Sequence, residues 1–577
     1  MTATLPPRAR GTGRRLADRA LGRLLRLPPP TTGCTVTRDV RIPMRDGQVL
    51  LADHWAPEGP ALGTLLLRSP YGWSGPMAAL HGGVFAARGY HVVLARCRGT
   101  FGSGGDFRPM VHEVEDGADT VAWLREQPWF GGRFATLGMS YLGFTQWALL
   151  VDPPPELATA IVQVGPHDFG ESVYAGGAFA LADFLGWSDM VAAQEEVRGV
   201  RGVVRSATAP RRLAPALAGL PLADAGEALL AGRAGWYRDW VSRRDLDDPF
   251  WAPMRLGVAL DRVRVPVLLH TGWQDLFLEQ SLAQYAHLRA RGRDVALTVG
   301  PWTHLQVLTR GAGPLLRECL DWLGEHLAGT AAGTAAGTAG RTRPEPVRVH
   351  VTGAGEWRDL PHWPPATTER VLHLAPGGAL APLAPPATAG PARFRYDPAD
   401  PTPTVGGRLL GAGSGYRDDR RLAARDDVLV LDSAPLPAPL EIVGCPVVEL
   451  AHTSDNPHVD LFARVSEVDA RGRSRNVSDG FRRLDPAAPD GVVRLELDAV
   501  AHRFGAGSRV RLLVAGGSHP RFERNLGTGE DPATSARTAP SHRSITLAGG
   551  ASRLLLPVPT AGSSDPPPQP DPRTETA

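Results

Sequence analysis

The sequence predicts an α/β fold with a mainly parallel sheet, an inserted helical segment and a following all-β region. Apolar strand-like runs alternate with helix-like segments up to about residue 165, which is typical of a parallel sheet covered on both faces. From about 166 to 260 this alternation gives way to helical spacing rich in Ala, Leu, Arg and Trp. Beyond residue 346, short alternating runs separated by Gly, Pro and Asp predict a β-sandwich or jelly roll.

Composition narrows the function classes. The 577 residues include 62 basic and 60 acidic side chains, and the formal net charge of +2 predicts neither a nucleic-acid partner nor a membrane surface. Every basic residue is arginine, so the absence of lysine excludes Walker-type phosphate loops, Schiff-base lysines and Ser-Lys dyads. The four cysteines lack C-x-x-C spacing, which favours free thiols in a reducing compartment.

The ends of the chain and one internal stretch are expected to lie outside the folded parts. The Arg- and Pro-rich N-terminus has no apolar run long enough for a secretory signal, so we expect a cytoplasmic protein, and no 18-residue apolar span predicts a membrane helix. The predicted segments are a disordered leader (1–35), a first core part (36–165), a helical cap (166–260), a second core part (261–327), a linker of A-A-G-T repeats (328–345), a jelly-roll β-sandwich (346–557) and a disordered tail (558–577).

Each predicted element follows from local patterning. The first core part opens with a hairpin at 35–56, whose turn is Asp46-Gly47. It continues with a strand at 63–68, a helix at 81–88, a strand at 90–95, a helix at 116–126, a strand at 134–139, a helix at 144–151 and a strand at 158–165. The second part has strands at 263–271 and 294–299 and a helix at 313–327, and the β region includes runs at 347–351, 446–451, 459–468, 492–497 and 509–515.

Ser140 stands out as a candidate nucleophile. It falls at the predicted turn between the strand at 134–139 and the following helix, with Gly138 and Gly143 on either side. A nucleophile elbow occupies such a turn, because glycines leave room for its tight backbone. The spacing G-x-S-x-x-G is one residue longer than the usual motif. Taken alone, the serine could equally be a helix cap.

Two later loops contain candidate partners for Ser140. Gly272-Trp273-Gln274-Asp275 follows the strand at 263–271, and Gly300-Pro301-Trp302-Thr303-His304 follows the strand at 294–299. The order serine, acid, histidine is that of α/β-hydrolases, and the carboxyl ends of parallel strands meet at one edge of a sheet. We therefore expect Ser140, Asp275 and His304 to converge as a catalytic triad.

These motifs carry a family resemblance. G-M-S-Y-L-G at 138–143, G-W-Q-D at 272–275 and G-P-W-T-H at 300–304 resemble the cocaine-esterase (CocE/NonD) hydrolases and the related X-prolyl dipeptidyl peptidases. The match extends through S-P-Y at 69–71, R-G-T-F-G-S at 98–103, Y-D-P-A-D-P at 396–401 and S-H-P-R-F-E-R-N at 518–525. The resemblance, which spans about residues 36 to 550, implies an α/β-hydrolase core with an inserted helical cap and a C-terminal jelly roll.

The resemblance also implies roles for individual residues. It makes Ser140 the nucleophile, His304 the base and Asp275 the orienting acid. It places the hydroxyl of Tyr71 and the backbone N–H of Tyr141 in the oxyanion hole. A tyrosine hydroxyl has a pKa near ~10, so it stays protonated at neutral pH and can donate to an oxyanion.

By the same resemblance, Trp187 and Phe277 would line an aromatic pocket for a bulky apolar acyl or leaving group of a small-molecule substrate. No cofactor is predicted. His112-Glu113 lacks a second histidine at the spacing of a zinc protease, so no metal site is predicted either.

Three functions are compatible with the sequence. An ester hydrolase of cocaine-esterase type is favoured. An X-prolyl dipeptidyl peptidase or an amino-acid ester or β-lactam acylase is the alternative, and either would need carboxylates to hold a substrate ammonium; the sequence reveals no clear carboxylate cluster near the elbow. A non-catalytic carbohydrate-binding protein is disfavoured by the complete triad. The oligomeric state is open, with a homodimer as one alternative.

Overall fold

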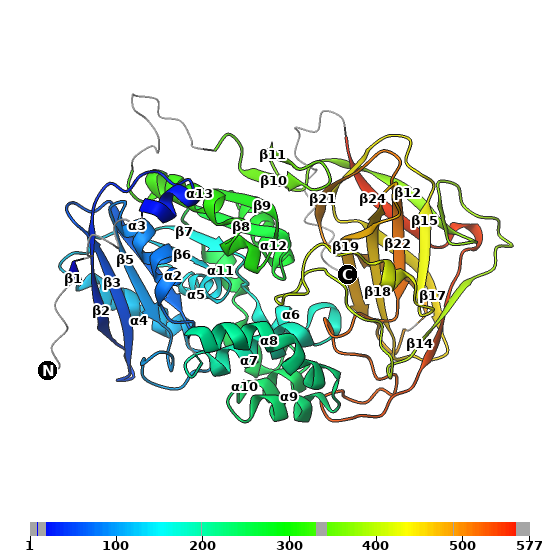
Figure 1. Ribbon diagram of the computed structural model, residues 1–577, viewed down its shortest axis with the longest axis horizontal. Helices are drawn as coiled ribbons and strands as arrows, with labels where there is room; N and C mark the ends of the chain where they lie inside the picture. The colour runs from blue at the N-terminus through cyan, green and yellow to red at the C-terminus, as the bar shows by residue number, and fades with distance from the viewer. Residues whose placement is uncertain (1–7, 10–18, 198, 330–342, 489, 561–577) are drawn as a thin grey trace.

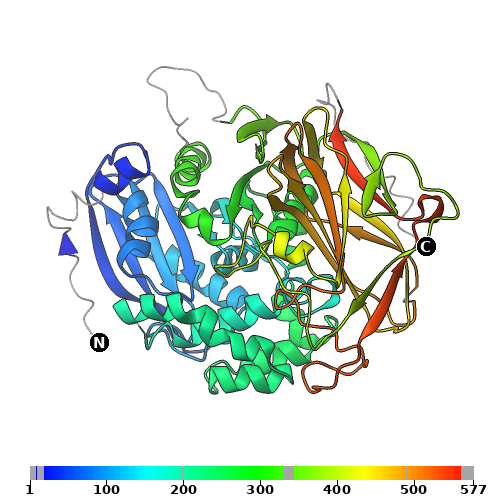
Figure 2. The same ribbon diagram turned by 45° about the vertical axis from the view of Figure 1, so that its right-hand side comes forward.

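The computed structural model describes residues 8–9, 19–197, 199–329, 343–488 and 490–560. Figure 1 shows three parts: an α/β core on the left, a group of helices below it, and a β-sandwich on the right. Turning the molecule, as in Figure 2, shows that the helical group borders both the core and the sandwich. Residues from all three parts can therefore contribute to one site.

The core is built on a sheet with the strand order β1-β2-β3-β5-β4-β6-β7-β8-β9-β10-β11, in which the run from β5 to β10 is parallel. Its strands are β1 (Arg8–Ala9), β2 (Cys34–Pro43), β3 (Val49–Pro57), β4 (Gly63–Ser69), β5 (Tyr90–Arg96), β6 (Phe134–Met139), β7 (Leu157–Gln163), β8 (Val267–Gln274), β9 (Val295–Thr303), β10 (Val347–Val351) and β11 (Glu356–Leu360). The helices of the core are α2 (Gly75–Ala78), α3 (Val84–Ala86), α4 (Glu113–Arg125), α5 (Tyr141–Leu149), α11 (Gly257–Arg262), α12 (Leu278–Ala290) and α13 (Ala312–His326). This arrangement confirms the predicted α/β class.

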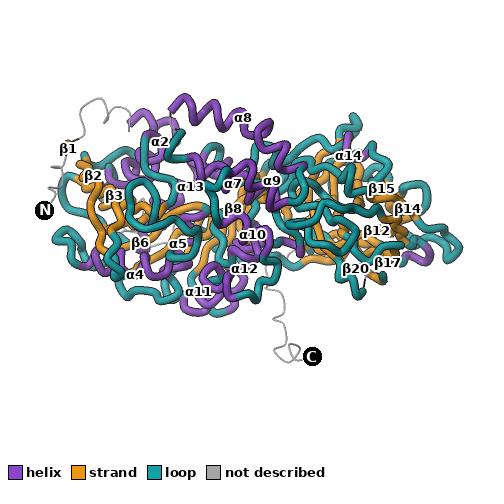
Figure 3. Tube along the Cα trace, turned by 90° about the horizontal axis from the view of Figure 1, so that it is seen from below, coloured by secondary structure: helices purple, strands orange, loops and turns teal. Residues whose placement is uncertain are grey.

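The helical group is inserted between β7 and β8. It comprises α6 (Phe169–Val173), α7 (Leu181–Ala193), α8 (Gly199–Ala218), α9 (Leu222–Leu230) and α10 (Trp236–Ser242). Seen from below in Figure 3, α8 runs along one edge of the molecule while α7, α9 and α10 lie nearer its middle. Aromatic rings hold α6, α7 and α10 together: Phe169 and Phe184 both contact Trp240. This group is called the cap below.

The C-terminal part is a β-sandwich whose strands form an eleven-stranded sheet and a two-stranded sheet. Its strands are β12 (Thr367–Ala375), β13 (Ala379–Ala381), β14 (Ala392–Tyr396), β15 (Val428–Ser433), β16 (Leu440–Gly444), β17 (Val447–Ser454), β18 (Asp460–Val468), β19 (Ser474–Arg483), β20 (Gly491–Glu496), β21 (Val500–Phe504), β22 (Arg509–Ala515), β23 (Ser541–Ile545) and β24 (Arg553–Pro559). Alternate residues such as Leu450, Val465 and Leu512 point into its apolar interior. This part confirms the predicted all-β region.

Two predicted boundaries are wrong. Val347–Val351 was expected in the sandwich but forms β10, which pairs in parallel with β9 of the core sheet. Its side chains alternate between buried and more exposed positions, and such alternation does not specify which sheet a short strand joins. The sandwich begins with β12, and its last strand ends at Pro559 rather than at residue 557.

The predicted disordered leader is also partly wrong. Residues 19–35 are folded onto the core, with Leu21, Leu25 and Leu27 packed against its apolar cluster. The Arg317 guanidinium donates to the Leu25 carbonyl at 2.9 Å. Leu21 and Leu25 are one helical turn apart, so they lie on the same face of a helix and can be buried together. This spacing was not recognised because arginines and prolines dominate the composition of the segment. Within the same predicted leader, Arg8–Ala9 form β1, which pairs antiparallel with β2. Residues 1–7 and 10–18, most of the linker and the tail from residue 561 lie outside the described residues.

Candidate active site

Ser140 lies at the sharp turn between β6 and α5. Its φ of 60° and ψ of −123° are strained for any residue other than glycine, and such strain persists where packing around it enforces it. Gly143 permits that packing, because a Cβ there would lie 2.5 Å from the Cα of Gly165. The turn therefore has the geometry expected of a nucleophile elbow.

Asp275 and His304 follow β8 and β9, neighbouring strands of the same sheet. The His304 Nδ1–H donates to Asp275 Oδ1 at 2.6 Å, and both side chains are buried. The other carboxylate oxygen, Oδ2, accepts the hydroxyl of Thr271 at 3.2 Å and the backbone N–H of Phe277 at 3.1 Å. These bonds fix the carboxylate, which in turn holds the proton of His304 on Nδ1 and leaves Nε2 free to accept another.

Ser140 and His304 face one narrow pocket. The pocket is lined by Tyr71, Met110, Ser140, Tyr141, Phe169, Asp183, Phe184, Trp187, Leu276, Phe277, His304 and Leu410. The ring of Phe277 packs edge-on against His304, with their centroids 5.5 Å apart. The structure thus gathers the predicted residues Ser140, His304, Tyr71, Tyr141, Trp187 and Phe277 around one apolar space, with Asp275 behind His304.

Tyr71, predicted as an oxyanion donor, has its hydroxyl inside this pocket. Trp187 Nε1 donates to that hydroxyl oxygen at 2.9 Å. Burial raises the pKa of Tyr71 to about 12, against the lowering effect of hydrogen bonds with Trp187 and Ser140. The phenol is therefore protonated throughout the neutral range and adjoins the Ser140 hydroxyl.

Tyr141 was predicted as an oxyanion donor through its backbone N–H, which is at the first position of α5, where an N–H has no acceptor within the helix. Its side chain is buried, and its hydroxyl donates to Glu113 Oε1 at 2.7 Å and accepts the N–H of Met110 at 2.9 Å. Glu113 also forms an ion pair of 2.7 Å with the buried Arg68, which is three residues before Tyr71. One buried ion pair therefore connects the backbone segments that carry both predicted oxyanion donors.

Sequence reasoning missed Glu113, having considered it only as half of an incomplete zinc motif. Glu113 could have been recognised from its place at the start of a helix whose buried face also includes Asp116 and Thr120. Acidic residues on a buried helix face need hydrogen-bonding or ionic partners, so such a residue has a structural role.

Asp183 is a second residue that the sequence did not reveal. It lies on α7 four positions before Trp187, so both side chains share one helix face and reach the pocket. One carboxylate oxygen accepts the backbone N–H of Leu410 at 2.8 Å. Burial raises the pKa of Asp183 to about 6, while the N–H of Leu410 and the neighbouring arginines Arg521 and Arg408 oppose the rise. A titratable carboxyl group therefore borders the apolar pocket.

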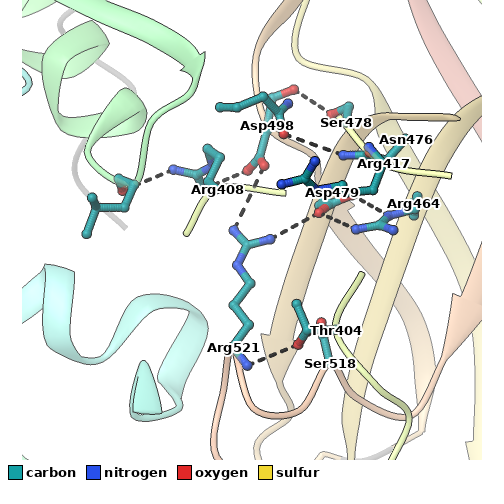
Figure 4. Close-up of polar contacts among 12 residues, drawn as sticks. Thr404, Arg408, Arg417, Arg464, Asn476, Ser478, Asp479, Asp498, Ser518 and Arg521 are labelled. Atoms are coloured by element: carbon teal, nitrogen blue, oxygen red, sulfur yellow. Dashed lines mark hydrogen bonds and ion pairs between the residues drawn. The ribbon is translucent and has the colours of Figure 1, made fainter. Parts of the chain in front are cut away.

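A loop of the sandwich closes the pocket. It contains Leu410 and is anchored by Arg408, which pairs with Asp498 of the sandwich at 2.6 Å and with Glu279 of α12 at 2.7 Å. Figure 4 shows Arg408 and Arg521 converging on Asp498, with Arg521 also bound to Asp479. Arg408 is thus fixed by the buried Asp498 of the sandwich and reaches the more exposed Glu279 of the core, close in sequence to Leu410.

A second, wider and more polar cavity adjoins the first and shares Asp183 and Leu276 with it. Its walls come from all three parts of the molecule and include Glu171 of the cap, Gln280 of the core and Arg521 of the sandwich. A substrate group that does not fit the apolar pocket has room on this side.

Within the described residues, no three or more His, Cys, Asp or Glu side chains are grouped as a metal site would require. In that same part of the chain, no helix combines the length and the apolar character needed to cross a membrane.

Comparisons with known proteins identify relatives of the whole chain. Residues 46–306 match the X-Pro dipeptidyl-peptidase (S15) family, and residues 339–555 match the X-Pro dipeptidyl-peptidase C-terminal non-catalytic domain. The chain is 29% identical over 546 residues to the cocaine esterase of Rhodococcus sp. (strain MB1 Bresler), and the alignment covers 86% of this chain and 93% of that protein.

Solved structures share the fold. An α-amino acid ester hydrolase is 22% identical with a TM-score of 0.75, covering 92% of this chain and 98% of that one. A CocE/NonD family hydrolase from Staphylococcus aureus is 18% identical with a TM-score of 0.66, covering 91% and 94% of the two chains. At these identities the likeness concerns the three-part architecture alone.

Proposed function

The chain belongs to the cocaine-esterase-like (CocE/NonD) hydrolases, relatives of the X-Pro dipeptidyl peptidases, and we propose that it hydrolyses carboxylic esters through an acyl-enzyme on Ser140. The family consists of serine hydrolases that act on ester or peptide bonds. The observation that carries the proposal is the 2.6 Å contact between His304 and Asp275, beside a pocket that Ser140 enters from a strained turn.

In the proposed reaction, the Ser140 hydroxyl oxygen attacks the ester carbonyl while its proton passes to His304 Nε2. Asp275 stabilises the imidazolium that forms. The carbonyl oxygen becomes an oxyanion, which accepts hydrogen bonds from the Tyr71 hydroxyl and the Tyr141 N–H. Collapse breaks the bond to the alkoxy oxygen, which leaves as the alcohol after taking the proton from His304. Water then attacks the acyl-enzyme with the same histidine as base, releasing the acid and restoring Ser140.

The pocket lining favours an apolar group on the substrate. Phe169, Phe184, Trp187 and Phe277 present aromatic surface around the position of Ser140. Burial of an aromatic ring against such walls is favourable by roughly 25 cal/mol per Å² of apolar surface. We therefore propose esters with a bulky apolar acyl or leaving group as substrates.

A second candidate is an acylase or peptidase that acts on aminoacyl esters or amides. Asp183 favours it, because a buried carboxylate at the pocket wall could hold a substrate ammonium, as such an activity requires. The matching family is described as X-Pro dipeptidyl peptidase, which is the same class of activity.

Labelling and a substrate panel test both candidates. A fluorophosphonate should modify the wild type and should fail to modify Ser140→Ala, while Ser206→Ala on the exposed side of α8 serves as the matched control and keeps labelling. Faster turnover of p-nitrophenyl butyrate and benzoate than of alanine p-nitroanilide and Gly-Pro-p-nitroanilide supports the esterase. The reverse ranking supports the second candidate. Undiminished labelling of Ser140→Ala would refute the assignment of the nucleophile.

A further inference from the structure

The hydrogen bond between Trp187 and Tyr71 determines where the phenol proton can point. An indole N–H is a donor and never an acceptor, so Tyr71 must accept in this contact of 2.9 Å. A phenol has one proton, and that proton cannot be directed at the group that already donates to the same oxygen. It must therefore point away from Trp187, and the pocket that Tyr71 and Ser140 both line is where the carbonyl oxygen of a bound substrate would accept it.

Trp187 is itself held in place. Its ring lies nearly parallel to that of Tyr141, with an interplanar angle of 8° and centroids 6.3 Å apart. On the cap side it contacts Trp240, with centroids 5.7 Å apart, and only 8% of its surface is exposed. A rigid donor restricts the rotation of the hydroxyl more effectively than solvent would, because water can donate to a phenol from many directions.

We propose that Trp187 is a positioning residue of the oxyanion hole, which directs the Tyr71 proton toward the reacting carbonyl oxygen. This inference rests on the proposed function. It changes the role of the cap: Tyr71 follows β4 of the core, whereas Trp187 is on α7 of the cap. The oxyanion hole is then complete only while the cap is docked on the core.

The inference differs measurably from the expectation that Trp187 is simply a wall of the acyl pocket. A wall residue acts on the binding of large acyl groups and has little effect on small ones. A residue that orients an oxyanion donor acts on the transition state of every ester, whatever the acyl group, and changes the rate constant rather than binding.

The test is a double-mutant cycle with Trp187→Phe and Tyr71→Phe, because phenylalanine keeps an aromatic ring but has no N–H. The burst of p-nitrophenol from p-nitrophenyl acetate and benzoate gives the acylation rate constant and the half-saturating ester concentration. Removing one oxyanion donor costs ~10²–10³ in rate, so losing its orientation should cost about tenfold or more for both esters. Half-saturation should change less than about twofold.

In the Tyr71→Phe background, Trp187→Phe should have no further effect on the acylation rate. Trp322→Phe is the matched control, since its indole donates to Thr159 at 2.7 Å in the core, away from the pocket lining, and its loss should leave both constants unchanged. Multiplicative losses in the double variant, or a change confined to the half-saturation of the benzoate, would overturn the inference.

A replacement of Trp187 by β-(3-benzothienyl)alanine provides a second arm if Trp187→Phe does not fold. Sulfur takes the place of the N–H in a ring of the same shape, so packing is retained and the donor is lost. The same drop in acylation is expected, and a normal rate refutes the inference. Failure of the proposed function looks different, because the wild type would then show no Ser140-dependent ester hydrolysis.

Discussion

Asp275→Asn tests how the carboxylate beside His304 acts. In the wild type, Oδ2 accepts two hydrogen bonds, from Thr271 and from the Phe277 N–H, while Oδ1 faces His304 Nδ1. An amide can satisfy both of those donors only with its oxygen, so its NH₂ must turn toward His304. Nδ1 then has to accept a hydrogen bond, which moves the imidazole proton to Nε2 and prevents that nitrogen from taking the proton of Ser140.

The expected loss is large because the substitution selects the wrong tautomer. Triads held in that tautomer lose ~10⁴ in kcat, which corresponds to ~5.5 kcal/mol of transition-state stabilisation. The fold should survive, since the amide keeps the two hydrogen bonds that the carboxylate oxygen accepts at this buried position.

Initial rates of p-nitrophenyl butyrate hydrolysis measure the effect, with circular dichroism as the check on folding. Asp261→Asn is the matched control: its carboxylate pairs with His287 at 2.9 Å but is half exposed, and its variant should keep full activity. A folded Asp275→Asn protein that loses less than about tenfold would contradict the role of Asp275.

Three further predictions concern Tyr71, Glu113 and Asp183. Tyr71→Phe should lower kcat by ~10² with little change in KM, since the donor acts mainly on the transition state; steady-state kinetics would disprove this by showing KM to be the main change. Glu113→Gln should cost ~3 kcal/mol, because it leaves the buried Arg68 without an ionic partner. The midpoint of thermal unfolding of this 577-residue chain should fall by roughly 2–3 °C, and an unaltered midpoint would argue against it. For Asp183→Asn, the pH dependence follows from the pKa of Asp183, raised from 3.8 to about 6 by burial. Between pH 4 and 6, the Asp183 carboxyl ionises in the unfolded chain while it is still mostly protonated in the folded protein. The free energy of unfolding of the wild type therefore falls as pH rises, by up to ~3 kcal/mol, and the full loss is reached above pH 6. Asparagine still accepts the Leu410 N–H without a charge, so the variant should gain stability over the wild type at pH 7.5 and not at pH 4; an equal difference at both pH values would contradict this.

Much of the fold could be predicted because it depends on neighbours in the chain. The strand at 134–139 coincides with β6. The strands predicted at 263–271 and 294–299 overlap β8 (Val267–Gln274) and β9 (Val295–Thr303), which continue further and end directly before Asp275 and His304. An apolar run followed by a glycine turn specifies a buried strand and its end within about ten residues. Parallel strands then bring their carboxyl ends to one edge, which is why these candidates could be grouped from sequence alone.

The sandwich assignment of Val347–Val351 failed for a related reason. Five alternating residues identify a strand, but the choice between β9 and a sandwich strand as partner depends on the whole fold. The folded part of the leader was missed because its leucines acquire meaning only against the core surface that they cover.

The sequence alone determined that a serine, an acid and a histidine follow three strands in the order found in α/β-hydrolases. It could do so because each strand and the residue after it are specified by a short stretch of chain. Tertiary structure alone decided which groups surround them. Asp183 meets Leu410 across 227 residues and Trp187 meets Tyr71 across 116, contacts between the cap and its two neighbours that no local pattern specifies. The physical reason is that helical spacing determines which side chains of α7 share one face. Which residues those side chains contact depends on the surfaces of the core and the sandwich that pack against that face.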